Sequence, residues 1–319
     1  MRVVVALGGN ALSPAGGSGS AQEMRGTLAT ACERLADLVE RGVTLVLTHG
    51  NGPQVGRILL QQEAAAPEVP PMPMDVCGAE SQGQIGYLLA QALDNALRAR
   101  GLSQCVFALI TQVMVDGRDP AFRRPTKPVG PAYDEQTARS IAATSGHVFQ
   151  PLGPGGRWRR VVASPLPVGF VEEAAITLVA DGGNVLVAAG GGGVPVVRDR
   201  WRPRAAKAAA YRGVEAVVDK DRTAALLAGL VGADVLAILT AVPRVQADFG
   251  TPRARELSRL SVAQARDMLA AGQLPEGSMG PKVQACCDFV TRSGGRAVIG
   301  ALDDVVDVVF ADAGTEVTV

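Results

Sequence analysis

Short runs of apolar residues alternate along the chain with longer stretches in which apolar residues recur every three or four positions. The short runs are rich in valine, leucine and isoleucine, which is typical of buried strands. They cover residues 2–7, 44–48, 104–110, 184–189, 213–218, 235–239, 296–300 and 307–310. The stretches with helical spacing cover about 22–41, 77–100, 174–180, 224–230, 261–271 and 278–293. Ser261 and Ser278 stand at the start of the last two, and we expect them to cap those helices. We therefore predict an α/β fold, a three-layer αβα sandwich around a mainly parallel central sheet.

Residues 112–167 depart from this alternation. Proline and glycine recur in this segment, at Arg123–Pro131 and Gly153–Arg160, and we expect them to exclude a long regular element from it. We predict that the segment is a lid or a small subdomain that protrudes from a single domain spanning residues 1–319. Lys127 lies in a stiff, proline-flanked part of it and could be carried over a site as a unit. A lysine that faces solvent is the more common explanation of such a residue.

The composition is that of a globular protein without a strongly charged partner. Of the 319 residues, 47% are apolar and 19% are charged, and 31 basic residues balance 31 acidic ones. This balance argues against a nucleic acid or an anionic membrane as partner. The five cysteines show no C-x-x-C spacing, so neither a disulfide framework nor a zinc site is predicted. No apolar run approaches the roughly 20 residues that cross a bilayer, and no signal-like segment precedes the first strand, so we expect a cytoplasmic protein.

Glycine-rich turns follow several of the predicted strands. Two of them, Gly8-Gly9-Asn10 and Gly50-Asn51-Gly52, follow the first two strands. Glycine lets backbone amides approach a ligand closely, so the two turns would line a crevice suited to a phosphoryl group or another small oxyanion. The run Gly190–Gly193 allows the same interpretation, and a flexible tight turn explains it equally well. The basic, alanine-rich segment 198–212 is either a hairpin or a loop.

Two polar residues near these turns have simpler explanations than catalysis. His49 could act as a general base, but a histidine at a strand end is more often a hydrogen-bonded structural residue. The Ser81-Gln82-Gly83 segment falls at the beginning of a predicted helix, where small residues permit close packing.

The turn Asp219-Lys220-Asp221 joins a predicted strand end to a predicted helix. Open α/β sheets place ligands at such turns, and a helix N-terminus favours anions. We expect Asp221 to cap the helix and Lys220 to be fixed and charged between the two carboxylates. A surface turn with one ordinary salt bridge is the alternative. Lys282, in the first turns of a later helix, opposes the helix dipole, which makes sense if an anion lies between them.

Lys127, Lys220 and Lys282 are therefore candidates to converge on one crevice. The sequence has no Walker A motif, no candidate metal cluster, and no serine or cysteine nucleophile with an evident base. Phosphoryl transfer needs none of these, because amide donors, cations and an orienting carboxylate around the transferred group are sufficient. The residues thus predict a phosphotransferase.

The glycine turns and the charged turns together closely resemble those of carbamate kinases, which belong to the amino acid kinase superfamily. The matching segments are Ala6–Leu12, His49–Gly56, Ser81–Tyr87, Thr126–Pro131, Gly190–Pro195, Gly213–Asp221 and Gly277–Lys282. They follow the family order over nearly the whole chain. Acetylglutamate kinases usually carry a lysine in the first glycine turn, and this chain, like carbamate kinases, has none there.

The resemblance implies reversible, MgATP-dependent transfer of a phosphoryl group between ATP and carbamate, run mostly towards ATP in arginine, agmatine or purine catabolism. It implies that Lys220 and Lys282 neutralise the phosphates, that Lys127 closes over them, and that Asp221 orients the lysines. It places carbamate and the phosphoryl group at Gly8, Gly9, Asn10, Gly50, Asn51, Gly52 and Ser81. It places the nucleotide at Gly190, Gly191, Lys220, Thr240, Ala241, Met279 and Lys282. It also implies Mg²⁺ with the nucleotide, and a homodimer.

The chain departs from the family pattern in two places. Pro243 and Gln246 stand where the family usually has an acidic residue and a tyrosine near the adenine, and Glu80 and Gln84 replace methionines that commonly flank the Ser-Gln-Gly segment. These differences bear on nucleotide affinity, dimer packing and the exact substrate. Two alternatives therefore stay open: a kinase of the same fold that acts on another small carboxylic acid, and a catalytically silent sensor of a nucleotide or carbamoyl phosphate. Retention of the three lysines and Asp221 argues against the sensor.

Overall fold

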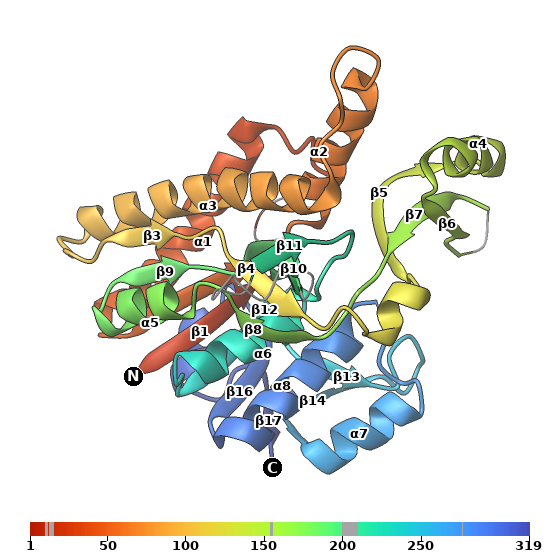
Figure 1. The fold of residues 1–319 in the computed structure, drawn as a ribbon. Coiled ribbons are helices and arrows are strands. Elements are labelled where there is room, and N and C mark those ends of the chain that lie inside the picture. The colour runs from red at the N-terminus through yellow and green to blue at the C-terminus, as the bar shows by residue number, and fades with distance from the viewer. Residues whose placement is uncertain (10–11, 13–15, 154–155, 200–209, 276) are drawn as a thin grey trace.

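An eight-stranded sheet organises the computed structural model, which describes all residues except 10–11, 13–15, 154–155, 200–209 and 276 (Figure 1). In spatial order its strands are β15 (Arg259–Ser261), β17 (Thr315–Thr318), β16 (Arg296–Ala301), β12 (Val235–Thr240), β1 (Arg2–Leu7), β2 (Thr44–His49), β9 (Val185–Val187) and β3 (Val106–Ala108). Neighbouring strands are parallel except for β16 and β17. The predicted mainly parallel sheet is confirmed.

Alternate residues of each central strand face two separate hydrophobic cores. In β1, the side chains of Val3 and Val5 join one core and those of Val4 and Ala6 join the other. One face is covered by α1 (Ala21–Glu40), α3 (Met74–Ala99) and α9 (Val305–Phe310), and the other by α5 (Glu173–Asp181), α6 (Lys220–Leu230), α7 (Val262–Ala270) and α8 (Met279–Ser293). Each fully buried valine or leucine contributes about 1.5–3 kcal/mol, so both helix layers are held firmly to the sheet. The predicted three-layer sandwich is confirmed.

Two smaller sheets lie beside the central one. The first contains β11 (Ala210–Gly213), β10 (Val194–Asp199), β4 (Gln112–Val115) and β8 (Pro167–Phe170), in that order. The second pairs β13 (Val245–Ala247) with β14 (Arg255–Leu257). Strands β10 and β11 are antiparallel, so the described ends of segment 198–212 fit the hairpin interpretation.

A three-stranded sheet protrudes from the rest of the chain together with one helix (Figure 1). It consists of β5 (Lys127–Tyr133), β7 (Trp158–Val162) and β6 (Val148–Pro151), with α4 (Glu135–Ser145) attached and α2 (Gly52–Ala65) packed against β5. The prediction that this segment holds no long regular element is wrong for α4. Asp134 caps that helix by accepting a hydrogen bond from the Thr137 amide at 2.8 Å.

The two ends of the predicted segment 112–167 belong to another part of the fold. Strand β4 begins at Gln112 and β8 begins at Pro167, and the two pair within the four-stranded sheet. A short 3₁₀ helix, η2 (Pro120–Arg123), leads from β4 towards the protruding sheet. The boundaries 112–167 and the movement of this unit as a lid stay predictions.

Two predicted strands are wrong. Gly213 is the last residue of β11, and residues 214–218 form no ladder; among them, Ala216 makes an isolated bridge to Ala163. Residues 307–310 lie in helix α9, where Val305, Val308 and Val309 are buried at helical spacing. The final strand is β17, further along the chain. Short apolar runs do not by themselves distinguish a strand from one turn of a buried helix.

The ends of two late helices test the capping expectations. Ser261 caps α7 through a reciprocal pair of hydrogen bonds with Gln264, as expected. Ser278 precedes α8, but its side chain makes no capping hydrogen bond, so that expectation is wrong. Gly294 ends α8 in the left-handed conformation, with φ of 69°. Among helices in the described part of the chain, none combines the length and apolarity needed to cross a bilayer.

Candidate active site

The turn that begins α6 arranges the charged residues of the site. Asp219 directly precedes Lys220, and its Oδ1 accepts hydrogen bonds from the amides of Asp221 at 3.0 Å and Arg222 at 3.4 Å. Asp219 is therefore the N-cap, and the prediction that Asp221 caps the helix is wrong. Because the helix starts earlier than its apolar spacing indicated, Asp221 falls in the first turn and its carboxylate can bind side chains.

Asp221 is the buried centre of a lysine pair. Its side chain is 4% exposed, and its two oxygens lie 2.5 Å from Lys220 Nζ and 2.8 Å from Lys282 Nζ. Burial alone would raise the pKa of Asp221, but the two ammonium groups outweigh burial and the net pKa is lowered. Burial lowers the pKa of Lys220, and the charge of Asp221 opposes that shift. The positive charge on Lys220 therefore depends on Asp221.

Lys127 reaches the same turn from the protruding sheet. Its Nζ lies 3.0 Å from Oδ2 of Asp219. Asp219 thus binds the start of α6 with one oxygen and a lysine of β5 with the other. The prediction that Lys220 lies between two carboxylates is wrong, because Asp219 pairs with Lys127 instead.

A cleft of about 510 Å³ brings these side chains together. Its lining includes Gly9, Gly50, Asn51, Gly52, Lys127, Arg159, Gly191, Asp219, Lys220, Asp221, Ser278 and Lys282. Strands β1 and β2 are parallel neighbours, so the turns that follow them lie side by side at one edge of the sheet. The three lysines and the two glycine turns meet in one cleft, as expected, although the Gly50 amide donates to the carbonyl oxygen of Leu7 at 3.1 Å.

Arg159 lines this cleft and was not predicted. It lies on β7, and its Nη2 donates a hydrogen bond to the carbonyl oxygen of Gly130 at 2.7 Å. The cluster of basic residues in Gly153–Arg160 was the available signal. The sequence could not show which of these arginines faces the cleft, since alternate strand residues point to opposite sides.

Asn51 is held by residues behind the cleft wall. Its Nδ2 donates to the Ser81 hydroxyl at 2.7 Å, and that hydroxyl donates to the carbonyl oxygen of Gly78 at 2.7 Å. Ser81 is fully buried and does not line the cleft. It was predicted to bind substrate, and the structure places it behind Asn51 instead.

The run Gly190–Gly193 packs closely against the site. It contains a short 3₁₀ turn, η3 (Gly190–Gly192), and Gly191 has φ of 66°. A Cβ on Gly191 would come within 2.1 Å of Asn51 Nδ2, so only glycine fits there. A Cβ on Gly190 would come within 2.3 Å of His49 Nε2, and Gly190 lies behind the cleft wall.

His49 has a structural environment. Its ring is buried, and Nδ1 lies 2.9 Å from the carbonyl oxygen of Gly50. Burial, with a smaller contribution from the charge of Lys220, lowers the pKa of His49 to about 4, although the hydrogen bond to the Gly50 carbonyl opposes the shift. The ring is therefore neutral at neutral pH, and it is not among the residues that line the cleft. The structural interpretation of His49 is the one that the geometry supports.

Two more cavities meet the cleft at Lys282, which lines all three. One, of about 450 Å³, is lined by residues that include Gly8, Gly9, Thr240, Ala241 and Asp303. The other, of about 200 Å³, is mostly apolar and is lined by residues that include Thr240, Val242, Gln246, Phe249 and Met279. Of the two departures near the adenine, Gln246 lines a cavity and Pro243 lines none of the three.

Two further predictions concern Asn10 and bound metal ions. Asn10 lies outside the described residues. Among the residues that the structure does describe, no group of three or more histidine, cysteine, aspartate or glutamate side chains could hold a metal ion.

Comparison with known proteins identifies the family. The sequence model of the amino acid kinase family matches residues 1–301. The chain belongs to the amino acid kinase family. The predicted class of enzyme, a phosphotransferase, is confirmed by this membership, and so is the amino acid kinase fold.

Within the family, similar proteins align over the whole chain. The carbamate kinase of Pyrococcus horikoshii is 44% identical over 319 residues, 99% of either chain. That of Halobacterium salinarum is 46% identical over 98% of this chain and 97% of its own. A structure of carbamate kinase from Giardia lamblia bound to AMP-PNP has a TM-score of 0.89 at 38% identity, covering 99% of this chain and 98% of that one. The predicted resemblance to carbamate kinases is confirmed.

Proposed function

We propose that the chain catalyses reversible phosphoryl transfer between MgATP and carbamate, giving ADP and carbamoyl phosphate. The observation that carries the proposal is the buried Asp221 with Lys220 and Lys282 on its two oxygens, at the meeting point of three cavities. Cations fixed in advance stabilise the charge on a transferring phosphoryl group without having to reorganise. The full-length relatives named carbamate kinase support the same substrate.

The transfer itself requires no covalent intermediate on the protein. A carbamate oxygen attacks the γ-phosphorus of ATP, the bond to the bridging oxygen breaks, and ADP leaves with the electron pair. Lys220 and Lys282 neutralise the transferring group and the nucleotide phosphates. The amides of Gly9 and Gly52 supply neutral donors, and Lys127 closes over the site from the protruding sheet.

The nucleotide occupies the two adjoining cavities. We place the adenine in the small apolar cavity beside Gln246 and Met279, and the phosphates near Lys282, which lines all three cavities. The carboxylates of Asp219 and Asp221 are already paired with lysines. Mg²⁺ would therefore come with the nucleotide, since phosphate oxygens are its usual ligands in kinases, and would supply further positive charge at the transferring group.

The physiological setting follows from the same proposal. We propose that the reaction runs towards ATP in arginine, agmatine or purine catabolism, in the cytoplasm. The pathway and direction are carried by the resemblance to carbamate kinases alone.

We also propose a homodimer that joins the two subunits along the β3 edge of the central sheet. In the described part of the chain β3 pairs with β9 only, and the large apolar side chains of Tyr87, Phe107, Ile110 and Leu178 near this edge are exposed. Exposed apolar groups beside an unpaired strand edge favour association. Analytical ultracentrifugation should find a dimer, and Phe107→Glu should shift it towards monomer. A wild-type monomer at micromolar concentration would refute this surface.

The experiment for the activity is ATP formation from ADP, Mg²⁺ and carbamoyl phosphate. Lys220→Ala and Lys282→Ala should each lower kcat at least about a hundredfold, because each removes a cation that faces the transferring group. Arg98→Ala is the matched control, since it removes a positive charge from an exposed pair with Asp94 on α3 and should keep full activity.

Other outcomes would redirect the assignment. Full activity in both lysine variants would refute the proposed site. A folded wild type that binds ADP without using carbamoyl phosphate would be tested with acetyl phosphate and other acyl phosphates. Turnover of one of these would assign a kinase of another small carboxylic acid, and turnover of none would assign a silent sensor.

A further inference from the structure

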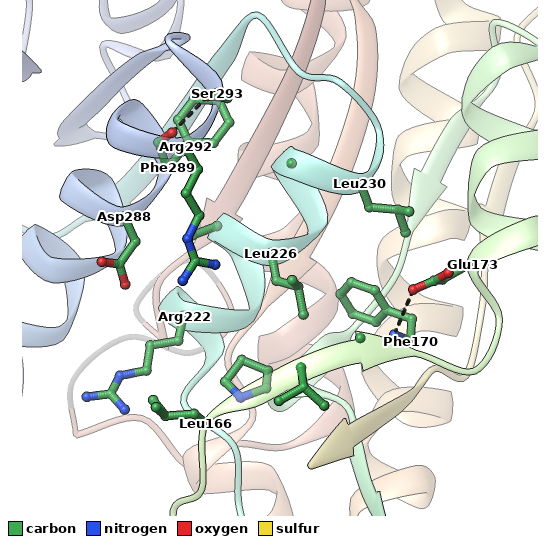
Figure 2. A pocket seen from close by; sticks show the side chains of 15 residues that line it. Leu166, Phe170, Glu173, Arg222, Leu226, Leu230, Asp288, Phe289, Arg292 and Ser293 are labelled. Atoms are coloured by element: carbon green, nitrogen blue, oxygen red, sulfur yellow. Dashed lines mark hydrogen bonds between the residues drawn. The ribbon is translucent and has the colours of Figure 1, made fainter. Parts of the chain in front are cut away.

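A groove of about 400 Å³ lies between β8, α6 and α8, and it shares no lining residue with the three cavities of the active site (Figure 2). Its volume falls in the range of small-molecule pockets, roughly 300–1,000 Å³. Nothing in the proposed phosphoryl transfer uses it.

The floor of the groove is apolar. Phe170 and Phe289 form its buried part, and Leu226 projects between them from α6 (Figure 2). At the rim, Leu166 is 53% exposed and Val168 is 61% exposed. An apolar molecule laid along these side chains would remove them from water, which is favourable by about 25 cal/mol for each Å² buried.

One side of the groove carries two arginines. Arg222 on α6 and Arg292 on α8 lie on this side (Figure 2). Within the described part of the chain neither guanidinium has a hydrogen-bond or ion-pair partner. Asp288 lies near them, and its Oδ1 accepts a hydrogen bond from Gln284 Nε2 at 2.9 Å. It keeps its negative charge, so two arginines and one aspartate leave this side of the groove with a net charge of +1. Net positive charge together with guanidinium donors that have no partner favours a carboxylate.

The acidic side chain at the other side of the groove does not change this conclusion. Glu173 lies beyond Phe170, and its Oε1 accepts from the Phe170 amide at 3.5 Å (Figure 2). It is thus separated from the arginines by the apolar floor. The groove therefore offers positive charge on one side and apolar surface next to it.

We propose that this groove binds a small organic anion with an apolar body, of the class of medium-chain or aryl carboxylates. The carboxylate lies against Arg222 and Arg292, and the hydrocarbon part covers Leu226, Phe170 and Val168. The charge selects an anion and the apolar floor selects against short polar anions such as acetate.

A ligand bound in the groove affects the active site through helix α6. The amide of Arg222 donates to Asp219, which caps the helix and binds Lys127, and Lys220 is the first helical residue. A ligand that fixes the Arg222 side chain therefore acts two residues away from the phosphate-binding lysine. Binding in the groove is the primary claim, and an altered KM for ADP is its expected consequence.

The test is isothermal titration calorimetry of the full-length protein with octanoate. Octanoate should bind saturably with one site per chain. Both 1-octanol, which lacks the carboxylate, and acetate, which lacks the hydrocarbon chain, should bind at least about tenfold more weakly. Two variants change residues that line the groove and leave every residue of the active site unchanged. Arg292→Gln should weaken octanoate about tenfold, and Gly229→Leu should abolish binding by filling the groove.

Gly229→Leu is suited to this purpose because a Cβ on Gly229 meets no atom within 4 Å. Both variants should keep the wild-type kcat. No saturable heat with octanoate up to about 10 mM, a concentration at which half-saturation would correspond to only about 2.7 kcal/mol of binding free energy, would overturn the proposal. Equal affinity for octanol, or unchanged octanoate binding in Gly229→Leu, would also overturn it. None of these results affects the phosphoryl-transfer assay, so the proposed groove ligand and the proposed kinase activity can be refuted separately.

Discussion

Replacing Asp221 with asparagine tests the reasoning about the site most directly. The substitution keeps the size of the side chain and removes the one negative charge that both Lys220 and Lys282 contact, at 2.5 and 2.8 Å. The two lysine side chains are only 14% and 13% exposed. In the variant they would face each other with little water and no shared counter-charge.

The expected magnitudes follow from this burial. Removing one partner of a buried ion pair costs about 3–5 kcal/mol, because an uncompensated charge remains. Loss of a proton from Lys220 limits that cost, so we expect about 3 kcal/mol. For a chain of this size each 1 kcal/mol lowers Tm by roughly 2–4 °C, which predicts a decrease of about 10 °C. We expect kcat to fall about a hundredfold or more, since the lysines lose their charge or their position.

The pH dependence gives a sharper signature. Burial lowers the pKa of Lys220, and Asp221 opposes this shift, so its loss lowers the pKa further. A lysine with a lower pKa loses its charge earlier as pH rises. The deficit of Asp221→Asn relative to wild type should therefore be larger at pH 9 than at pH 6.

The assay is ATP formation from carbamoyl phosphate across this pH range, together with thermal unfolding. Asp94→Asn is the control, because it removes a carboxylate from an exposed pair with Arg98. A variant with Tm and kcat close to wild type would refute the idea that Asp221 holds the lysines. A deficit that grows towards acid pH would refute the assigned sign.

Three further predictions concern stability and the nucleotide. The pKa of His49 in the folded protein is lowered to about 4, so neutral His49 stabilises the fold fully above the unfolded pKa of 6.5. That stabilisation, about 3 kcal/mol, is lost as pH falls towards 4. Denaturant titrations should show this pH dependence in wild type and not in His49→Gln. Gly191→Ala should cost at least about 1–3 kcal/mol through its φ of 66° and its collision with Asn51, whereas Gly229→Ala should cost nothing; equal urea midpoints of the two would contradict the packing argument. Gln246→Tyr should lower the KM for ADP about threefold to tenfold by stacking in the apolar cavity, and an unchanged KM would place the adenine elsewhere.

Periodicity in the sequence was sufficient for the layers of the fold. The alternation in β1 sends Val3 and Val4 to opposite cores, and this is a local property of any strand. The strand ends with glycine turns were likewise visible, because glycine and asparagine mark turns whatever surrounds them. The hydrophobic pattern did not identify the secondary structure correctly where an apolar run was short. Residues 305–310 have the apolar content of a strand and the spacing of a single helical turn, and only packing on the central sheet decides between them.

The choice of partners in the site was decided by tertiary structure alone. The sequence showed Asp219, Lys220 and Asp221 side by side, yet Asp219 pairs with Lys127, 92 residues away, and Asp221 pairs with Lys282, 61 residues away. Which carboxylate caps α6 depends on where the helix begins, and that point is set by packing. Sequence determines which charges are available. The meeting of three separate elements at one buried point determines which of them pair, because burial makes an unpaired charge too costly to leave.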